Sequence, residues 1–386
     1  MRLEVSQSPE WASQSDPFRL FFPLGLAYGI WAIGIWVPYA MGLVQTFPGP
    51  LHAALALRGF ELSFVAGFLM TSLPRFTQTR VASKGELITA MALLVLPAVQ
   101  FGFDAFSNIT AAPVAALAFL AVFGLRRFRG RKINPPDSFV FVPAALVLGI
   151  VGSFLYDQSI GKALIHHGFI PALILGIGGR LIPGLLGWTE IVATQRARYE
   201  QPLPFLKVTS SFTLAILVLF LASFPIELIA ESVGRSIRAG AIFAMAIVRW
   251  NLLKRPSHRT AFAWLVWAAC WSFVVGSFCY ALLPRFKLES EHVIFIGGYS
   301  LLTLLVASRV TLAHAGAGAL DFEKRRWPYM LFAAAIFVSL VTRIFAAAVP
   351  SAYVSHLGYA SAAWLFGIAI WNAYFLPRCL RKKSKN

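Results

Sequence analysis

Charged residues are scarce in this chain of 386 residues. Asp, Glu, Lys and Arg together make up 13% of it, whereas hydrophobic residues make up 58% and the mean hydropathy is +0.70. A typical soluble domain has about a quarter of its residues charged, which keeps its surface hydrated. The composition therefore excludes a soluble globular enzyme and indicates a protein that lies in a lipid bilayer.

Cysteine is also rare. The three cysteines, Cys270, Cys279 and Cys379, are too few for a disulfide framework, and the sequence has neither a CxxC pair nor a Cys/His cluster. Structural zinc sites and iron–sulfur sites need such clusters, so both are excluded. Cysteine therefore does not carry the chemistry of this protein.

Long apolar runs fill most of the chain. A transmembrane helix needs roughly 17 to 25 mostly apolar residues. We predict an all-α integral membrane protein with a single twelve-helix membrane domain at 20–376, an N-terminal tail at 1–19 and a basic tail at 377–386. The twelve predicted spans are 20–44, 52–74, 87–103, 109–125, 138–156, 163–188, 208–226, 232–249, 260–283, 292–314, 327–349 and 352–376.

The eighth span, at 232–249, has the weakest apolar character. Arg235 and Arg238 leave only ten uncharged residues before Arg249. This span therefore depends on both arginines reaching outward to the polar headgroups. A prediction without this span would destroy the alternation of charge in the loops that follow, which is an independent reason to include it.

The 34 Lys and Arg residues lie mostly on one side of these spans. The N-terminal tail, the loops after even-numbered spans and the C-terminal tail carry 25 of them, the other side carries five, and four fall inside spans. The positive-inside rule then places both termini in the cytoplasm. The basic segments 126–132 and 378–385 are interpreted as juxtamembrane signals and not as nucleic-acid patches. The N-terminal tail has no small-residue cleavage site, so no signal peptide is expected.

Spans 2, 6 and 10 share a sequence pattern. Each has a histidine near its outer end, then a Gly-aromatic step, then a stretch of small residues. The Gly-aromatic steps are Gly59-Phe60, Gly168-Phe169 and Gly298-Tyr299, and the units begin four spans apart. A period of four helices in twelve predicts a bundle of pseudo-threefold four-helix repeats. The alternative is coincidence, because Gly and Phe are common in membrane helices.

Five of the seven histidines begin spans on the non-cytoplasmic side. Imidazole is a common ligand of haem iron and copper, and histidines from different helices of a bundle build such sites. We predict a metal site there; the alternative for each residue is a harmless histidine at the membrane interface. His314, at the cytoplasmic end of span 10, would serve a second site. The five histidines are His52, His166, His167, His292 and His356.

Four arginines fall inside predicted spans, where a charged side chain is costly and normally has a partner. Glu61 is the only acid deep in a span and stands three residues after Arg58, so these two are expected to pair on one helix face. Arg180, Arg309 and Arg343 have no acidic partner in their own helices. Either backbone carbonyls satisfy them, or they bind an anion such as a haem propionate or a transported solute.

Four ordered motifs resemble the NnrS family. They occupy 16–22, 67–74, 178–183 and 309–314, with the sequences DPFRLFF, GFLMTSLP, GGRLIP and RVTLAH. The resemblance runs from about residue 16 to the last span. It implies a twelve-helix inner-membrane protein that contains haem and copper. It also implies a role in the nitric oxide response and in tolerance of nitrosative stress in denitrifying and related bacteria.

The outer end of span 2 departs from the family pattern. That pattern reads Trp-His-x-His-Glu, whereas this chain has Leu51-His52-Ala53-Ala54-Leu55, which lacks the second histidine and the acid. One metal ligand is therefore in doubt, and we expect a divergent member with a single metal site, or with haem and no copper. The histidines on spans 2, 6 and 10 also resemble the haem-copper oxidase core in arrangement, which is a fold-level analogy.

The leading hypothesis is a bacterial inner-membrane protein that binds haem, with or without copper, and reacts with or senses nitric oxide or its metal-nitrosyl products. His52 and His292 are expected as axial ligands, and His166 or His167 as a further iron or copper ligand. The alternatives are a secondary transporter of an anion and an accessory protein without chemistry of its own. Membrane lipid and nitric oxide are the expected partners. The arginines expected to neutralise propionates are Arg58, Arg180, Arg309 and Arg343.

Overall fold

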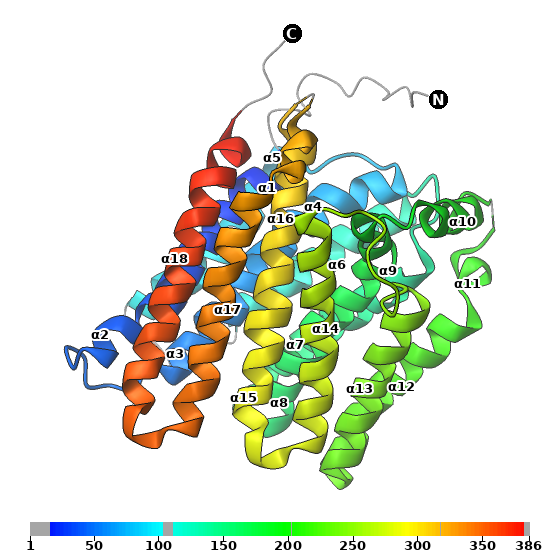
Figure 1. Ribbon diagram of the computed structural model, residues 1–386. Coiled ribbons are helices and arrows are strands. Elements are labelled where there is room, and N and C mark those ends of the chain that lie inside the picture. Colours follow the sequence, from blue (N-terminus) through cyan, green and yellow to red (C-terminus); the bar gives the residue numbers. More distant parts are fainter. Residues whose placement is uncertain (1–15, 103–110, 202, 317, 382–386) are drawn as a thin grey trace.

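The structure is a computed structural model that describes residues 16–102, 111–201, 203–316 and 318–381. Every regular element in these residues is helical (Figure 1). A bilayer favours this outcome, because a helix satisfies its backbone hydrogen bonds internally and the lipid offers no partners. The all-helical fold class is confirmed. Much of both predicted tails, and the adjoining ends of the predicted spans 87–103 and 109–125, lie outside the described residues.

The long helices run side by side between two ends of the molecule (Figure 1). They are α1 (Phe18–Gly34), α4 (Leu62–Thr77), α5 (Lys84–Gly102), α6 (Ala111–Arg129), α7 (Phe141–Phe154), α9 (Ile170–Leu186), α12 (Ser211–Ile229), α13 (Glu231–Val248), α14 (Ala261–Leu282), α16 (Leu301–His314), α17 (Arg326–Ala348) and α18 (Tyr353–Leu380). Shorter elements join or extend them: α2 (Trp36–Ala40), α3 (Gly49–Ala54), α8 (Ser159–Ala163), α10 (Thr189–Tyr199), α11 (Phe205–Val208) and α15 (Lys287–His292), with 3₁₀ turns η4 (Asp137–Val140), η6 (Pro284–Phe286), η8 (Ala319–Lys324) and η9 (Pro350–Ala352).

Ten helical stretches among the described residues are long and apolar enough to cross a membrane. They coincide with ten of the predicted spans and define a multi-pass membrane protein. The other two, 87–103 and 232–249, are helical as α5 and α13, but neither meets that requirement within the described residues. Helix α13 carries both Arg235 and Arg238, and α5 adjoins residues outside the described ranges. Twelve spans therefore stays a prediction.

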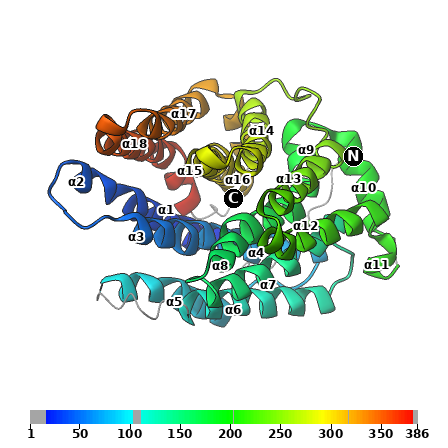
Figure 2. The ribbon, with the colours of Figure 1, turned by 90° about the horizontal axis from the view of Figure 1, so that it is seen from below.

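The stretches with the histidine motifs are among the most buried. In each stretch we take the apolar window of 18 residues and the share of it that is buried. This share is 83% in Gly49–Thr77, 72% in Ser159–Leu186 and 61% in Pro284–His314, against 28% in Ser211–Ile229. In the end-on view, α8 and α15 lie near the middle of the molecule. Helices α5 and α6 lie along one edge and α17 and α18 along the opposite edge (Figure 2). The inside of the bundle is therefore built largely from these three stretches, where polar side chains are shielded from lipid.

Each of these three stretches contains a π-helical segment in the same place. The segments η2 (Leu55–Glu61), η5 (Leu164–Phe169) and η7 (Val293–Ser300) each lie between a short α-helix and the long helix that follows it. Each also contains one Gly-aromatic step of the sequence pattern. A π-helix bonds residue i to residue i+5, so it holds an extra residue in the turn, and such segments recur at functional sites.

The first and last described helices meet at one end of the bundle. The guanidinium of Arg19 donates to the carbonyl oxygens of Cys379 at 2.6 Å, Arg381 at 2.5 Å and His314 at 3.1 Å. The start of α1 and the end of α18 therefore lie on the same side, as an even number of spans requires.

A buried ion pair joins α5 to α6. Arg127 is 1% exposed, and its Nη1 and Nη2 donate to Glu86 at 2.5 and 2.7 Å. Partial burial disfavours the carboxylate, but hydrogen bonds from Arg127 and Ser83 outweigh it and lower the pKa of Glu86 from its ordinary value of 4.5 to about 2. The pair therefore stabilises the folded protein fully above the ordinary pKa. This contribution is lost as the pH falls from 4.5 toward 2.

We predict that Glu86→Gln lowers the free energy of unfolding by about 3 kcal/mol at pH 7, because it leaves a buried guanidinium without a counter-charge. Thermal unfolding of the detergent-purified protein measures the change. Glu200→Gln is the matched control, since Glu200 and Arg196 form an exposed pair of a kind worth at most about 1 kcal/mol. Equal shifts in the two variants would contradict the assignment.

Candidate functional site

A large cavity lies inside the bundle, and its lining includes residues of α3 and α15. These two helices lie at the same end of the molecule (Figure 1). The volume of the cavity is about 450 Å³, which falls in the range of roughly 300 to 1,000 Å³ typical of ligand and cofactor pockets. Much of its wall is aliphatic or aromatic and includes Trp36, Phe60 and Trp364. Its acidic, basic and imidazole side chains are His52, Glu61, His166, Glu291, His292 and Arg343.

His52 and His292 reach this cavity from two different helices. The Nδ1 atom of His52 lies 2.9 Å from the carbonyl oxygen of Ala32, and that of His292 lies 2.7 Å from the carbonyl oxygen of Leu288. Because a carbonyl oxygen only accepts, Nδ1 carries the proton in both rings. The lone pair on Nε2 is then left to bind a ligand, which is the usual arrangement of a metal-binding histidine.

The adjacent residues His166 and His167 have different surroundings. His166 lines the large cavity, and its Nε2 is buried without a hydrogen-bond partner among the described residues. His167 is not part of the cavity lining: its Nε2 lies 3.0 Å from Oε1 of Glu291, and its ring stacks on Tyr280 at 4.1 Å. The structure therefore brings His166 together with His52 and His292, and it holds His167 apart.

The π-helical segment η2 changes the expected partner of Arg58. Arg58 and Glu61 both lie in η2, where the extra residue per turn separates side chains that an α-helix would bring together. The guanidinium of Arg58 lies over the Tyr156 ring at 3.6 Å, and Glu61 instead accepts a hydrogen bond from Thr303 at 3.0 Å. The expected Arg58–Glu61 pair does not form in this structure, and the two side chains act separately.

Arg343 in α17 is the arginine that lines the large cavity. It is 7% exposed, and its Nη1 is buried with no hydrogen-bond partner among the described residues. A buried donor of a charged group that lacks an acceptor costs free energy. Arg343 therefore offers an unused donor and a positive charge to an anionic group.

The remaining predicted arginines lie elsewhere. Arg309 pairs at 2.5 Å with Glu323, an acid in η8 and so outside its own helix. Arg180 lies over the Phe76 ring at 5.0 Å. Neither of them, nor Arg58, lines the large cavity.

His314 and His356 are also outside the cavity lining. His314 ends α16, the helix that follows His292 and η7; its Nδ1 lies 2.7 Å from the carbonyl oxygen of Val310, and its Nε2 contacts Arg75. His356 packs against the rings of Phe345 and Tyr359. The structure therefore brings together three of the six predicted metal-binding histidines.

Among the described residues, no group of three or more His, Cys, Asp or Glu side chains is close enough to hold one metal ion. A haem iron needs at most two protein ligands, so this absence does not bear on a haem site. A copper ion held by three protein side chains has no preformed ligand set in this part of the chain.

Apolar helices that cross the bilayer repeatedly, and a histidine-lined cavity between them, define a multi-pass membrane protein with an internal candidate binding site. A family model described as NnrS protein matches residues 13–383, which is nearly the whole chain. The chain therefore belongs to the NnrS family, and the resemblance of its four motifs is confirmed. A search of curated proteins found no match.

Sequence reasoning missed several residues of the cavity. Glu291 lines it beside His292 and holds His167 by a hydrogen bond. The sequence did offer a signal for Glu291, because this residue directly precedes His292, a predicted metal ligand at the start of a span. Trp36 and Trp364 also line the cavity, but aromatic residues are so common in membrane helices that the sequence did not distinguish them.

Glu61 is only 5% exposed, so its buried carboxyl group needs a hydrogen-bond partner within the protein, and Thr303 donates this bond. We predict that Thr303→Val, which keeps the shape but removes the donor, lowers the free energy of unfolding by about 1–3 kcal/mol. Thermal unfolding in detergent provides the measurement. Thr342→Val is the control, because Thr342 bonds to carbonyl oxygens of its own helix. If the control were destabilised as much, Thr303 would have no special role.

Proposed function

We propose that this NnrS family member is a haem-binding protein of the bacterial inner membrane that acts in the nitric oxide response or in protection from nitrosative stress. The observation that carries the proposal is the pair His52 and His292, which line one cavity with the Nδ1 of each ring already bound to a carbonyl oxygen. The link to nitric oxide rests on family membership.

Four features of the cavity suit a haem group. The volume of about 450 Å³ and the aromatic wall suit a large planar ring. The unused Nη1 of Arg343 suits a propionate, and the unpartnered Nε2 of His166 offers one further ligand. His52 and His292 would hold the iron, Arg343 would neutralise a propionate and His166 would bind a second ligand or metal.

When bound, haem would supply one-electron chemistry, and it would bind nitric oxide reversibly in exchange for one of the two imidazoles. The chain's own residues would set its surroundings. The carbonyl groups of Ala32 and Leu288 orient the two imidazoles and make them more basic. The positive charge of Arg343 would favour the reduced state of the haem, and the apolar wall would keep water away from it.

Copper is not part of this proposal. Ala54 and Leu55 stand where the family pattern has a histidine and an acid. The described residues also bring no three ligands together. His166 is the residue that a second metal would use first, because His167 is already engaged by Glu291.

The proposal extends to the architecture. The π-helical segments η2, η5 and η7, at equivalent places, support a pseudo-threefold repeat of four helices similar to the haem-copper oxidase core. The meeting of α1 and α18 supports an even number of spans, with twelve as proposed. The positive-inside rule then places both ends in the cytoplasm.

A secondary transporter of an anion is the second candidate function. The observation that favours it is the unpartnered donor of Arg343 in an internal cavity. Arg309 gives it no support, because Glu323 already neutralises that charge. A transporter needs no haem, so cofactor content separates the two candidates, and an accessory protein would show neither haem nor anion flux.

We predict that the purified protein binds haem and that His52→Ala and His292→Ala each remove most of it, because each variant lacks one of the two residues that would hold the iron. The measurement is the Soret absorbance and the pyridine haemochrome content per protein. His258→Ala, a substitution in a loop, is the matched control. Adding imidazole to His52→Gly should restore the low-spin spectrum. Full haem content in both alanine variants would disprove the assignment.

We predict that Arg343→Gln shifts the haem midpoint potential to a more negative value, because the lost positive charge had favoured the reduced state. Spectroelectrochemical titration measures the shift. Arg309→Gln should have little effect, because Arg309 is paired with Glu323. The transporter would be favoured instead if the protein were free of haem, if proteoliposomes containing it took up an anion, and if Arg343→Gln abolished that uptake.

A further inference from the structure

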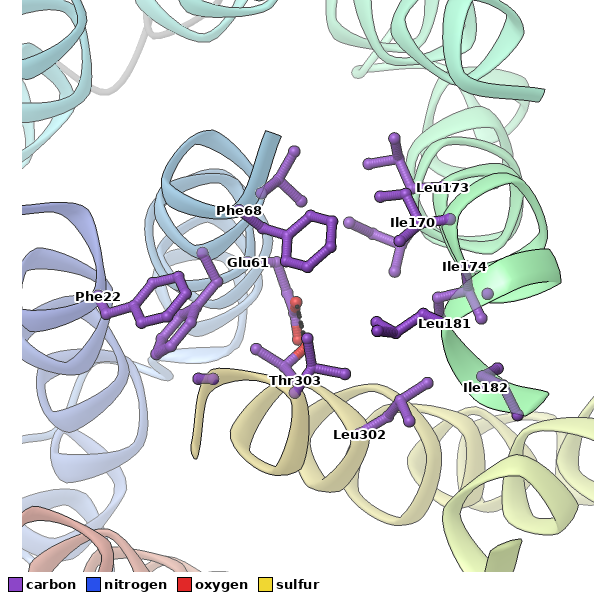
Figure 3. Close-up of a pocket in the computed structure, with 16 residues that line it drawn as sticks. Phe22, Glu61, Phe68, Ile170, Leu173, Ile174, Leu181, Ile182, Leu302 and Thr303 are labelled. Carbon is purple, nitrogen blue, oxygen red and sulfur yellow. Dashed lines mark hydrogen bonds between the residues drawn. The ribbon is translucent and has the colours of Figure 1, made fainter. Parts of the chain in front are cut away.

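A second cavity lies deeper in the bundle, between the long helices that follow the π-helical segments. Side chains of α4, α9 and α16 point toward its centre, joined by Phe22 of α1 (Figure 3). Its volume is about 100 Å³. This space suits a molecule of a few atoms and is too small for a haem or a sugar.

The lining of this small cavity is almost entirely apolar. Its polar side chains are Glu61 and Thr303, and these two are already hydrogen-bonded to each other at 3.0 Å. A water molecule needs two to four polar partners to remain in a buried site, whereas apolar cavities stay dry and bind uncharged guests such as xenon. The mostly apolar lining therefore favours a small uncharged molecule. The apolar lining residues include Phe22, Phe68, Ile174, Leu181, Val306 and Ala307.

Glu61 lies in the wall of both cavities. It is the one residue found in the lining of both the small cavity and the large cavity of His52 and His292, within the part of the chain that the structure describes. The bond from Thr303 Oγ1 to Glu61 Oε2 fixes the carboxyl group in this position. A molecule that moved from one cavity to the other would pass this side chain.

We propose that the small cavity is a binding site for a diatomic gas, and that a gas held there enters the large cavity past Glu61. A diatomic gas matches the volume, has no charge and needs no hydrogen bonds. It also dissolves better in lipid than in water, so a site between membrane helices collects it from the bilayer. The identity of the gas as nitric oxide rests on the proposed function, whereas the site itself does not.

Xenon is the probe for the site, because it enters dry apolar cavities and gives a strong crystallographic signal. Crystals of the full-length protein under xenon pressure should show one atom between α4, α9 and α16. Ala307→Leu, which extends a buried side chain into the small cavity, should remove that atom. Ala334→Leu makes the same substitution at an exposed position of α17 and should leave it in place. Ile174→Phe provides a second filling variant if Ala307→Leu does not fold.

Passage is tested by the rate at which nitric oxide binds to the reduced haem after flash photolysis. Ala307→Leu should slow this rate severalfold at unchanged haem content, whereas Ala334→Leu should not. A cavity without xenon, or one filled by a lipid or detergent chain, would overturn the gas site. An unchanged rate in a variant that has lost xenon would overturn the passage. Protein without haem would refute the proposed function, and the xenon result would still decide the site.

Discussion

Water is absent from the interior of a bilayer, so every polar group placed there must find its partner within the protein. This constraint makes every regular element of the described residues helical and favours burial of the polar side chains that lie within the bundle. It also explains why the irregular backbone is π-helical: such a segment keeps its hydrogen bonds while changing the direction of the side chains. The three π segments therefore shape the cavity without exposing backbone groups to lipid.

The same constraint separates arginines that look alike in the sequence. Arg309 is neutralised by Glu323, and Arg58 rests on the ring of Tyr156. Arg343 retains a buried donor without a partner and faces the large cavity. Arg58 also keeps two unpartnered buried donors, Nε and Nη2, but it lies outside the lining of the large cavity. The position of Arg343 beside two oriented imidazoles, and not the unpartnered donor alone, therefore points to a ligand in this cavity.

The sequence predicted the helices well, because long apolar runs between basic loops depend on composition and little else. It also placed His52, His166 and His292 near one another, since all three begin helices on one side. It could not predict the register inside η2, where one extra residue per turn separates Arg58 from Glu61. The partner of Arg309 follows fourteen residues later, in a turn whose path depends on tertiary packing.

The bond between Arg19 and the carbonyl groups near the end of α18 has a consequence for assembly. The helix made early in synthesis finds these partners only when α18, made last among the described helices, reaches the membrane. Until then the partners within reach of the Arg19 guanidinium are the carboxylate of Asp16 and the carbonyl oxygen of His314. The contact between α1 and α18 can therefore form only after all the described helices have been made. Because α1 and α18 are neighbours, a circular permutant in which α18 is linked to α1 and the chain begins at another loop would keep every helix in its place.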